Sequence, residues 1–381
     1  KDTRKSGDML EAALTAGLCS MGAKVIPLGV VPTPAVAYLT RYYKADAGVV
    51  ISASHNPCEY NGIKFFNSDG YKLSDGIENE IESYILGEKA IEELPTHGKV
   101  GYVSANHNAV EDYVAFAVST IDCRLDGMKI AVDCANGASY ETAFKALNKL
   151  GANVEAIHNT PDGVNINHMC GSTHMESLQA YVTSIGADIG IAFDGDADRM
   201  LAVDENGKLI DGDQIMAACA KFMRDNGTLK QNTLVATVMS NLGLFMAGEK
   251  IGINIPRTKV GDRYVLEEML AKGYNIGGEQ SGHIIFLDHN TTGDGLVSAL
   301  QFLSVLKKTG MKASEAASIV TVMPQVLRNA VVKLENKNSY MENEEIAAAC
   351  KALEDEFAGE GRVLIRPSGT EPLVRVMIEG K

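Results

Sequence analysis

Several features that would place a chain in a common functional class are missing from this sequence. No apolar stretch among its 381 residues approaches the roughly 18 residues of a membrane-spanning helix, and no secretory signal opens it. The formal net charge is -14 at pH 7, so acidic residues outnumber basic ones. We therefore expect a soluble, cytoplasmic protein whose partners are neither nucleic acids nor membranes, because both are anionic.

Metal-type and nucleotide-type motifs are missing as well. The seven cysteines form no Cys-x-x-Cys pair, which fits reduced thiols better than disulfides or a zinc site. His158, His168 and His174 show no recognisable metal spacing, so core or surface positions are expected for them. There is no P-loop, no dinucleotide-binding Gly-x-Gly-x-x-Gly and no Gly-x-Ser-x-Gly. A nucleotide-dependent kinase, a dehydrogenase or an α/β-hydrolase is therefore not supported.

What the chain does contain is an internal repeat. Gly22–Pro32 recurs as Gly151–Pro161, Ala45–Val49 recurs as Ala187–Ile191, and a weaker third copy covers Leu234–His283. Predicted strands alternate with predicted helices in each copy, which indicates α/β units. Chance similarity is the alternative, because each match is short.

The repeat predicts the fold class: three related mixed α/β domains and a smaller C-terminal α+β domain. The last domain is set apart because the pattern changes near Met323-Pro324, after which strands flank a single amphipathic helix. With 45% hydrophobic residues the chain can bury a large core. The four predicted domains are residues 1–108, 109–207, 208–321 and 322–381.

A serine follows a predicted buried strand near the start of the chain. Val49–Ile51 runs into Ser52–Pro57, and ligands of α/β sheets bind at the carboxyl ends of strands. Pro57 biases Asn56 away from helical geometry, so we expect a loop of fixed shape that presents Ser54. An ordinary surface turn is the alternative.

Three aspartates follow a second predicted strand at alternate positions. Asp194, Asp196 and Asp198 can converge on one hard divalent cation, because magnesium and calcium prefer oxygen ligands. An EF-hand is excluded, since its sixth loop position requires glycine and is Arg199 here. A solvated acidic turn is the alternative, although three carboxylates so close would repel one another without a cation.

Two further loops have the composition of binding loops. Arg366–Pro372 with Arg375 offers guanidinium groups, hydroxyls and a glycine, which suit an anion. Gly277–His283 combines a carboxylate, an amide, a hydroxyl and an imidazole, which suit the hydroxyls of a sugar. The alternatives are an ordinary turn before a strand and a glycine-rich hairpin.

Together the four loops point to phosphoryl transfer on a sugar. A phosphate on Ser54 would add about -1.5 to -2 charges, which a magnesium ion held by the three aspartates could neutralise. His55 and Lys64 are candidates for proton transfer or for stabilising the transition-state charge. Arg199 would supply a further cation.

The same four loops, in this order, resemble those of the α-D-phosphohexomutases. Three more segments resemble the branch of that family that acts on glucosamine phosphates, and the resemblance covers nearly the whole chain. These segments are Asn165–Asn167 with Cys170–His174, Thr258–Tyr264 and Leu287–Asp294.

The resemblance implies a four-domain enzyme that interconverts glucosamine 6-phosphate and glucosamine 1-phosphate on the route to UDP-N-acetylglucosamine. Ser54 would be the phosphoserine and, with the three aspartates, would ligate one Mg²⁺ per chain. Glucosamine 1,6-bisphosphate would be the intermediate, and it or glucose 1,6-bisphosphate the activator. A hexosamine phosphate would be the partner, and a homodimer is the assembly to test.

The resemblance also implies the roles of individual side chains. Ser54, His55 and Lys64 would be catalytic. The substrate would be held by residues from all three later domains. These are Arg199, Lys259, Glu279, Ser281, His283, Arg366, Ser368, Gly369, Thr370 and Arg375.

The chain departs from the family at both ends. Nothing in it matches the family's N-terminal segment with its arginine-bearing motif or the helix expected beyond Lys381, so we expect an incomplete first and last domain. Three rival functions remain: a phosphohexomutase for glucose or mannose phosphate, an inactive sugar-phosphate binding protein, and an aspartyl-phosphate enzyme. The last is suggested because Phe193–Asp196 resembles a strand-borne Asp-x-Asp nucleophile.

Overall fold

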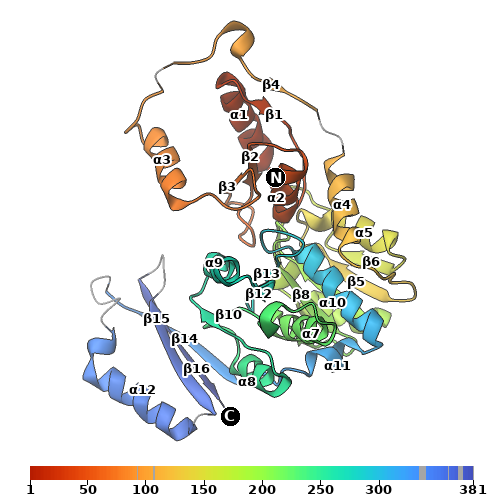
Figure 1. Ribbon diagram of the computed structural model, residues 1–381, viewed down its shortest axis with the longest axis vertical. Coiled ribbons are helices and arrows are strands. Elements are labelled where there is room, and N and C mark those ends of the chain that lie inside the picture. Colours follow the sequence, from red (N-terminus) through yellow and green to blue (C-terminus); the bar gives the residue numbers. More distant parts are fainter. Residues whose placement is uncertain (92, 106–107, 334–339, 359, 368–371, 381) are drawn as a thin grey trace.

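The computed structural model describes residues 1–381 except 92, 106–107, 334–339, 359, 368–371 and 381. An N-terminal part, a central body and a small C-terminal unit follow one another along the chain (Figure 1). None of the helices in the described ranges is both long and apolar enough to span a bilayer.

The N-terminal part places the Ser54 loop between two antiparallel strands, β2 and β3. Val50 and Ile51 of β2 are buried, and β2 packs against α2, whose inner face is buried at Ala35, Val36 and Leu39. The strand predicted before Ser54 is therefore confirmed. The elements are α1 (Ser6–Ser20), β1 (Lys24–Val25), α2 (Thr33–Tyr42), β2 (Ala47–Ile51), β3 (Ile63–Asn67), α3 (Asp75–Ile85) and β4 (Tyr102–Val103).

The next part is built on a five-stranded sheet with the strand order β6-β5-β7-β8-β9. β5 pairs in parallel with β6 and β7, whereas β8 and β9 are antiparallel. Every residue of β7 is buried, as expected for a central strand covered on both faces. The elements are α4 (Ala109–Ser119), β5 (Lys129–Asp133), α5 (Ser139–Lys149), β6 (Asn153–Ile157), α6 (Glu176–Ile185), β7 (Ile189–Phe193), β8 (Met200–Asp204) and β9 (Leu209–Ile210).

The third part has shorter strands and more helix. Its first helix, α7, begins with a capping box in which the side chains of Asp211 and Gln214 each accept a hydrogen bond from the other's backbone N–H. The elements are α7 (Gly212–Asp225), β10 (Ala236–Thr237), α8 (Leu242–Ile251), β11 (Arg257–Thr258), α9 (Asp262–Lys272), β12 (Ile276–Gly278), β13 (Ile284–Phe286), α10 (Gly295–Thr309) and α11 (Ala313–Ala317).

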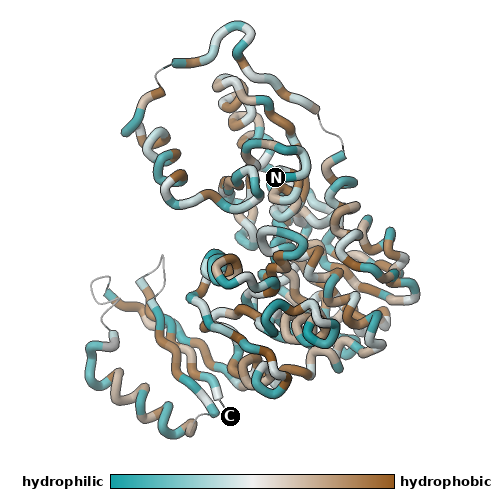
Figure 2. The backbone as a smooth tube through the Cα atoms, in the orientation of Figure 1, coloured by the Kyte–Doolittle hydropathy of each residue, from teal (hydrophilic) through white to brown (hydrophobic). Residues whose placement is uncertain are grey.

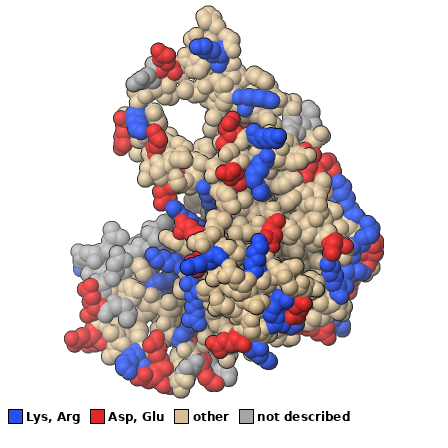
Figure 3. Space-filling model, viewed as in Figure 1, with Lys and Arg blue, Asp and Glu red and all other residues tan. Residues whose placement is uncertain are grey.

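The C-terminal unit is an antiparallel sheet, β14-β16-β15, with one helix against β15. Its strands carry both apolar and polar residues (Figure 2). The predicted α+β character of this unit is confirmed. Lys and Arg side chains gather where it meets the region of α8 and α9 (Figure 3). The elements are β14 (Gln325–Val331), α12 (Glu344–Phe357), β15 (Gly361–Pro367) and β16 (Leu373–Gly380).

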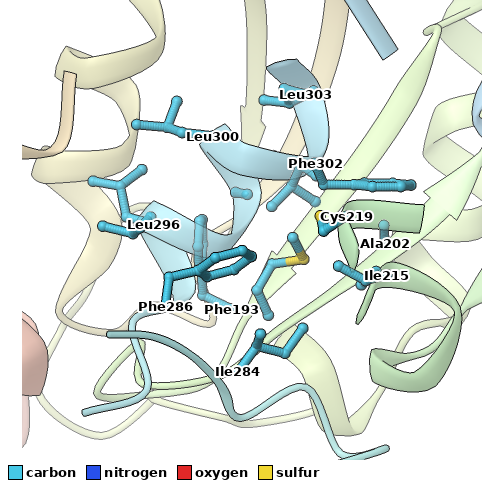
Figure 4. Packing of buried hydrophobic residues seen from close by; sticks show 14 of the residues in the cluster. Phe193, Ala202, Ile215, Cys219, Ile284, Phe286, Leu296, Leu300, Phe302 and Leu303 are labelled. Carbon is cyan, nitrogen blue, oxygen red and sulfur yellow. The ribbon is translucent and has the colours of Figure 1, made fainter. Parts of the chain in front are cut away.

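The main hydrophobic core joins the second and third parts. Phe193 of β7 lies among Ile215 of α7, Phe286 of β13 and Leu300 of α10 (Figure 4). Packed interiors are dense and resist relative movement, so this core holds the aspartate loop after β7 beside the loop between β12 and β13. It also crosses the boundary expected at residues 207–208, and the predicted domain limits stay predictions.

Candidate active site

Ser54 and the aspartate loop meet at the ends of two strands from different parts of the chain. Ser54 Oγ donates a hydrogen bond of 2.7 Å to Oδ2 of Asp194. Ser54 follows β2 and Asp194 follows β7, so the two carboxyl ends of these strands face each other. The backbone of Ser54 is left-handed, with φ 51°, which is uncommon for a residue other than glycine.

The three aspartates form a candidate metal site. Asp194, Asp196 and Asp198 are buried, and each offers a carboxylate oxygen within 4.8 Å of the others. Oδ1 of Asp196 and Oδ1 of Asp198 are buried, and neither has a hydrogen-bond partner among the residues that the structure describes. Burial, together with the charges of Asp198 and Asp196, raises the pKa of Asp194 well above its ordinary value. Unpaired buried oxygens and mutual repulsion are what a hard divalent cation would relieve.

Lys64 reaches this acidic cluster from β3. Its Nζ lies 2.7 Å from Oδ2 of Asp196 and 3.9 Å from Oδ2 of Asp198. Burial acts to lower the pKa of Lys64, but the two carboxylates outweigh it and raise the pKa. Lys64 is therefore an ammonium at neutral pH, which suits stabilisation of negative charge better than proton acceptance.

His55 and Arg199 lie next to Ser54 on the same side. Nδ1 of His55 is 3.5 Å from Ser54 Oγ and 3.3 Å from Nη1 of Arg199. Because a guanidinium can only donate, Nδ1 accepts this bond and carries no proton. Burial and the charge of Arg199 lower the pKa of His55, so the neutral imidazole is favoured.

His283 lies between Asp198 of the candidate metal site and Asp262. It is 3% exposed, and its Nδ1 is 3.7 Å from Oδ2 of Asp198 while its Nε2 is 3.5 Å from Oδ2 of Asp262. Burial acts to lower the pKa of His283, but the two carboxylates raise it. The structure thus places this residue against Asp198, and its predicted contact with substrate stays a prediction.

The predicted sugar-binding residues lie on neighbouring loops. Oε1 of Glu279 accepts a 3.0 Å hydrogen bond from the backbone N–H of Gly261, which ties two loops together. Ser281 and Lys259 are exposed, and Nζ of Lys259 lies 5.7 Å from the ring centroid of Tyr264. These side chains are therefore accessible to a ligand.

Two arginines of the predicted phosphate loop sit opposite each other on paired strands. Arg366 of β15 is in register with Arg375 of β16. Burial and the charge of Arg375 lower the pKa of Arg366, and Glu279 opposes them, so the C-terminal sheet and the predicted sugar-binding loop are electrostatic neighbours. Ser368, Gly369 and Thr370 lie outside the described residues.

A second group of ligand-type side chains is satisfied internally. Asp133, His158 and Cys170 also have atoms within 4.8 Å of one another. The Asp133 carboxylate accepts hydrogen bonds from the backbone N–H groups of Ala135 and Gly171 and lies 2.9 Å from Nδ1 of His158. This arrangement joins three loops, which agrees with the structural position expected for His158.

Some neighbours of the site were not singled out by the sequence analysis. Thr33 Oγ1, at the start of α2, donates a 2.6 Å hydrogen bond to Oδ2 of Asp196. Arg4 and Asn167 contact the backbone of the Ser54 loop. Asn167 belongs to a segment that carried the family resemblance, so a signal existed for it. Nothing local in the sequence marks the other two.

Four family models match the chain in order. They are those described as phosphoglucomutase/phosphomannomutase alpha/beta/alpha domain I, domain II and domain III, and the C-terminal domain. The matched residues are 1–92, 110–207, 211–323 and 330–381.

Curated relatives match over the full length of this chain. A phosphoglucosamine mutase from Ruminiclostridium cellulolyticum is 64% identical over 380 residues, which is 100% of this chain and 85% of the relative. A phosphoglucosamine mutase from Clostridium acetobutylicum is 61% identical with the same coverage.

Solved structures show the same fold at lower identity. A phosphoglucomutase/phosphomannomutase family protein from Burkholderia thailandensis is 24% identical with a TM-score of 0.82, covering 100% of this chain and 83% of that one. N-acetylphosphoglucosamine mutase from Aspergillus fumigatus, in complex with GlcNAc-6P and magnesium, is 19% identical with a TM-score of 0.66. It covers 91% of this chain and 89% of that one.

Proposed function

Because the chain belongs to the phosphoglucomutase/phosphomannomutase family, we propose that it interconverts glucosamine 6-phosphate and glucosamine 1-phosphate. It is an enzyme of the isomerase class, as its curated relatives are phosphoglucosamine mutases at 59–64% identity. The product would supply UDP-N-acetylglucosamine synthesis. A mutase acting on glucose or mannose phosphate is the second candidate, since the family models cover both.

The observation that carries the proposal is the hydrogen bond from Ser54 Oγ to Asp194. It puts the hydroxyl that is predicted to carry the phosphate against the candidate metal site. Asp194, Asp196 and Asp198 would hold Mg²⁺ together with a phosphate on Ser54. The ion would neutralise phosphate charge and polarise phosphorus.

Side chains of this protein would supply the proton transfer and the stabilisation of charge in the first phosphoryl transfer. A hydroxyl of the bound sugar phosphate attacks the phosphorus on Ser54, and the bond from phosphorus to Oγ breaks with its electron pair left on Oγ. The hydroxyl proton passes to a base, which returns a proton to Oγ. Unprotonated Nδ1 of His55 is the candidate base, 3.5 Å from Ser54 Oγ. Lys64 and Arg199 stabilise the charge that spreads over the transferring group.

The second transfer returns a phosphoryl group to Ser54 from the other end of the sugar. Between the two steps, glucosamine 1,6-bisphosphate would reverse its orientation in the site. Glu279 and Ser281 would hold sugar hydroxyls in either orientation, while Arg366 and Arg375 would hold the phosphate that is not reacting. Glucose 1,6-bisphosphate would serve as an activator by loading Ser54.

Two measurements test the proposal directly. Mass spectrometry of the intact protein after incubation with glucose 1,6-bisphosphate should find one phosphate, localised to residues 52–57. A coupled assay with glucosamine, glucose and mannose 6-phosphates should give the largest kcat/KM with glucosamine 6-phosphate. A phosphate elsewhere, or preference for another sugar, would contradict the mutase mechanism or the substrate assignment respectively.

A further inference from the structure

The loop that carries Ser54 is held from both sides by two side chains that are distant in sequence. Nη2 of Arg4 donates to the carbonyl oxygens of Ser54 and Asn56, at 2.8 Å and 2.9 Å. Nδ2 of Asn167 donates to the same two oxygens, at 2.8 Å and 3.0 Å. The two side chains therefore donate hydrogen bonds to one pair of carbonyl oxygens, those of Ser54 and Asn56, which flank His55. We call these two side chains, Arg4 and Asn167, the clamp.

Arg4 is fixed before it reaches the loop. Its Nε donates to Oδ2 of Asp2 at 2.8 Å, and both side chains are fully buried. The same Asp2 oxygen accepts a 2.6 Å hydrogen bond from Oγ of Ser52, and Oγ of Ser52 accepts one of 3.0 Å from the backbone N–H of Ser54. Both backbone polar groups of Ser54 are thus bonded within this network.

Asn167 approaches from the other part of the chain, in the loop after β6. It is 7% exposed, and its backbone N–H donates 2.9 Å to the carbonyl of Ala135. A Cβ on Gly195, within the aspartate loop, would lie only 2.6 Å from both the Ser54 carbonyl and Nδ2 of Asn167. Asn167 and the aspartate loop are therefore both packed against the carbonyl of Ser54.

We infer that Arg4 and Asn167 are positioning residues that hold Ser54 in its left-handed conformation and so direct Oγ at Asp194. A non-glycine residue in this region costs free energy, and it persists where the surroundings fix it. Asn167 belongs to a different part of the fold from Ser54. The hydroxyl of Ser54 is therefore directed at Asp194 only when these two parts of the fold are in contact. This inference rests on the proposed phosphoserine function.

The decisive variant is Asn167→Gly. Asn167 itself has φ 59°, so glycine removes the clamp without straining the backbone. Met169→Gly is the matched control, because Met169 lies in the same loop, also has a positive φ of 52°, and is 64% exposed. We expect Asn167→Gly to lower kcat by about ten- to a hundredfold, as small misplacements of reacting groups do. KM should change less than about threefold, and Met169→Gly should resemble wild type.

A second readout does not depend on turnover. Hydrogen–deuterium exchange of the peptide covering residues 52–60 should be faster in Asn167→Gly than in wild type and in Met169→Gly. If wild type neither converts sugar phosphates nor carries phosphate on Ser54, the proposed function fails, and this exchange measurement still decides whether the clamp holds the loop. Unchanged exchange, unchanged kcat, or a loss confined to KM would each overturn the inference.

Arg4 supplies an independent variant. Arg4→Ala would leave Asp2 as an unpaired buried charge and would endanger folding, so Arg4→Lys is the better substitution. A lysine keeps a positive charge beside Asp2 but cannot bond both carbonyls with a fixed planar group. Arg4→Lys should lower kcat in the same direction as Asn167→Gly and speed exchange of the same peptide. If Arg4→Lys keeps the wild-type kcat, Arg4 does not position Ser54.

Discussion

Nζ of Lys64 lies 2.7 Å from Oδ2 of Asp196, joining residues 132 positions apart in the chain. The ammonium contacts one oxygen of the carboxylate. The other oxygen, Oδ1, is buried and has no hydrogen-bond partner within the described part of the chain. One carboxylate thus carries a fixed positive partner on one side and an open coordination position on the other. That division is what the proposed mechanism requires of a carboxylate shared between a divalent cation and Lys64.

The first prediction concerns this carboxylate. Asp196→Asn should raise the Mg²⁺ concentration needed for half-maximal turnover by at least about tenfold, because the amide keeps the shape but loses the charge that hard cations require. Isothermal calorimetry with Mg²⁺ alone gives a readout besides activity. Asp204→Asn is the control, since Asp204 is also buried but caps a turn at the far end of β8. Equal Mg²⁺ affinity in wild type and Asp196→Asn would contradict the metal site.

The second prediction concerns the phosphate carrier. Ser54→Ala should remove turnover, while binding of glucosamine 6-phosphate remains measurable by calorimetry, because the variant loses only the hydroxyl. Ser119→Ala, at an exposed serine of α4, should behave as wild type. Wild-type protein loaded with phosphate should keep it in hydroxylamine, to which an acyl phosphate is labile. A hydroxylamine-sensitive adduct on Asp194 would favour the aspartyl-phosphate rival instead.

The local sequence was sufficient to predict the Ser54 loop and the aspartate loop. It was not sufficient to predict the side chains that hold the Ser54 loop in place. Ser54 and Asp194 each follow a short apolar strand and lie in a turn, so the strand and the loop at its carboxyl end could both be predicted from a few residues. Arg4 and Asn167 reach the Ser54 loop across long sequence separations, and such contacts are set by the packing of whole elements.

The third prediction concerns the C-terminal arginines. Arg366→Ala should weaken binding of glucosamine 6-phosphate about ten- to a hundredfold, since charge-assisted hydrogen bonds to phosphate contribute about 1.5–3 kcal/mol each. Arg328→Ala, at an exposed position of β14 in the same sheet, should leave affinity unchanged. Calorimetry with the sugar phosphate measures both. If the two variants bind equally well, Arg366 does not hold the phosphate.

The last prediction uses a buried carboxyl outside the site. Asp213 on α7 is 1% exposed, and its Oδ2 accepts a 2.6 Å hydrogen bond from the backbone N–H of Asn241. Burial and the neighbouring Asp211 raise the pKa of Asp213 from 3.8 to about 7. The protonated form is thus favoured in the folded state. Its stabilising contribution is complete below pH 3.8 and is lost as the pH rises through about 7.

Asp213→Asn should therefore raise the free energy of unfolding by an amount that is small near pH 4, grows as the pH rises toward 7 and is largest at pH 8, because the amide keeps an acceptor for Asn241 and never ionises. Each unit of pKa difference corresponds to about 1.4 kcal/mol, so a gain of at least about 1 kcal/mol is expected at pH 8. Urea unfolding at pH 4, 5, 6, 7 and 8 measures how this gain grows with pH. Asp225→Asn, at the exposed end of the same helix, should not stabilise, because hydrogen bonds from Lys221 and Arg224 lower the pKa of Asp225. A variant Asp213→Asn that is less stable than wild type at pH 8 would show that the charged carboxylate is the native form.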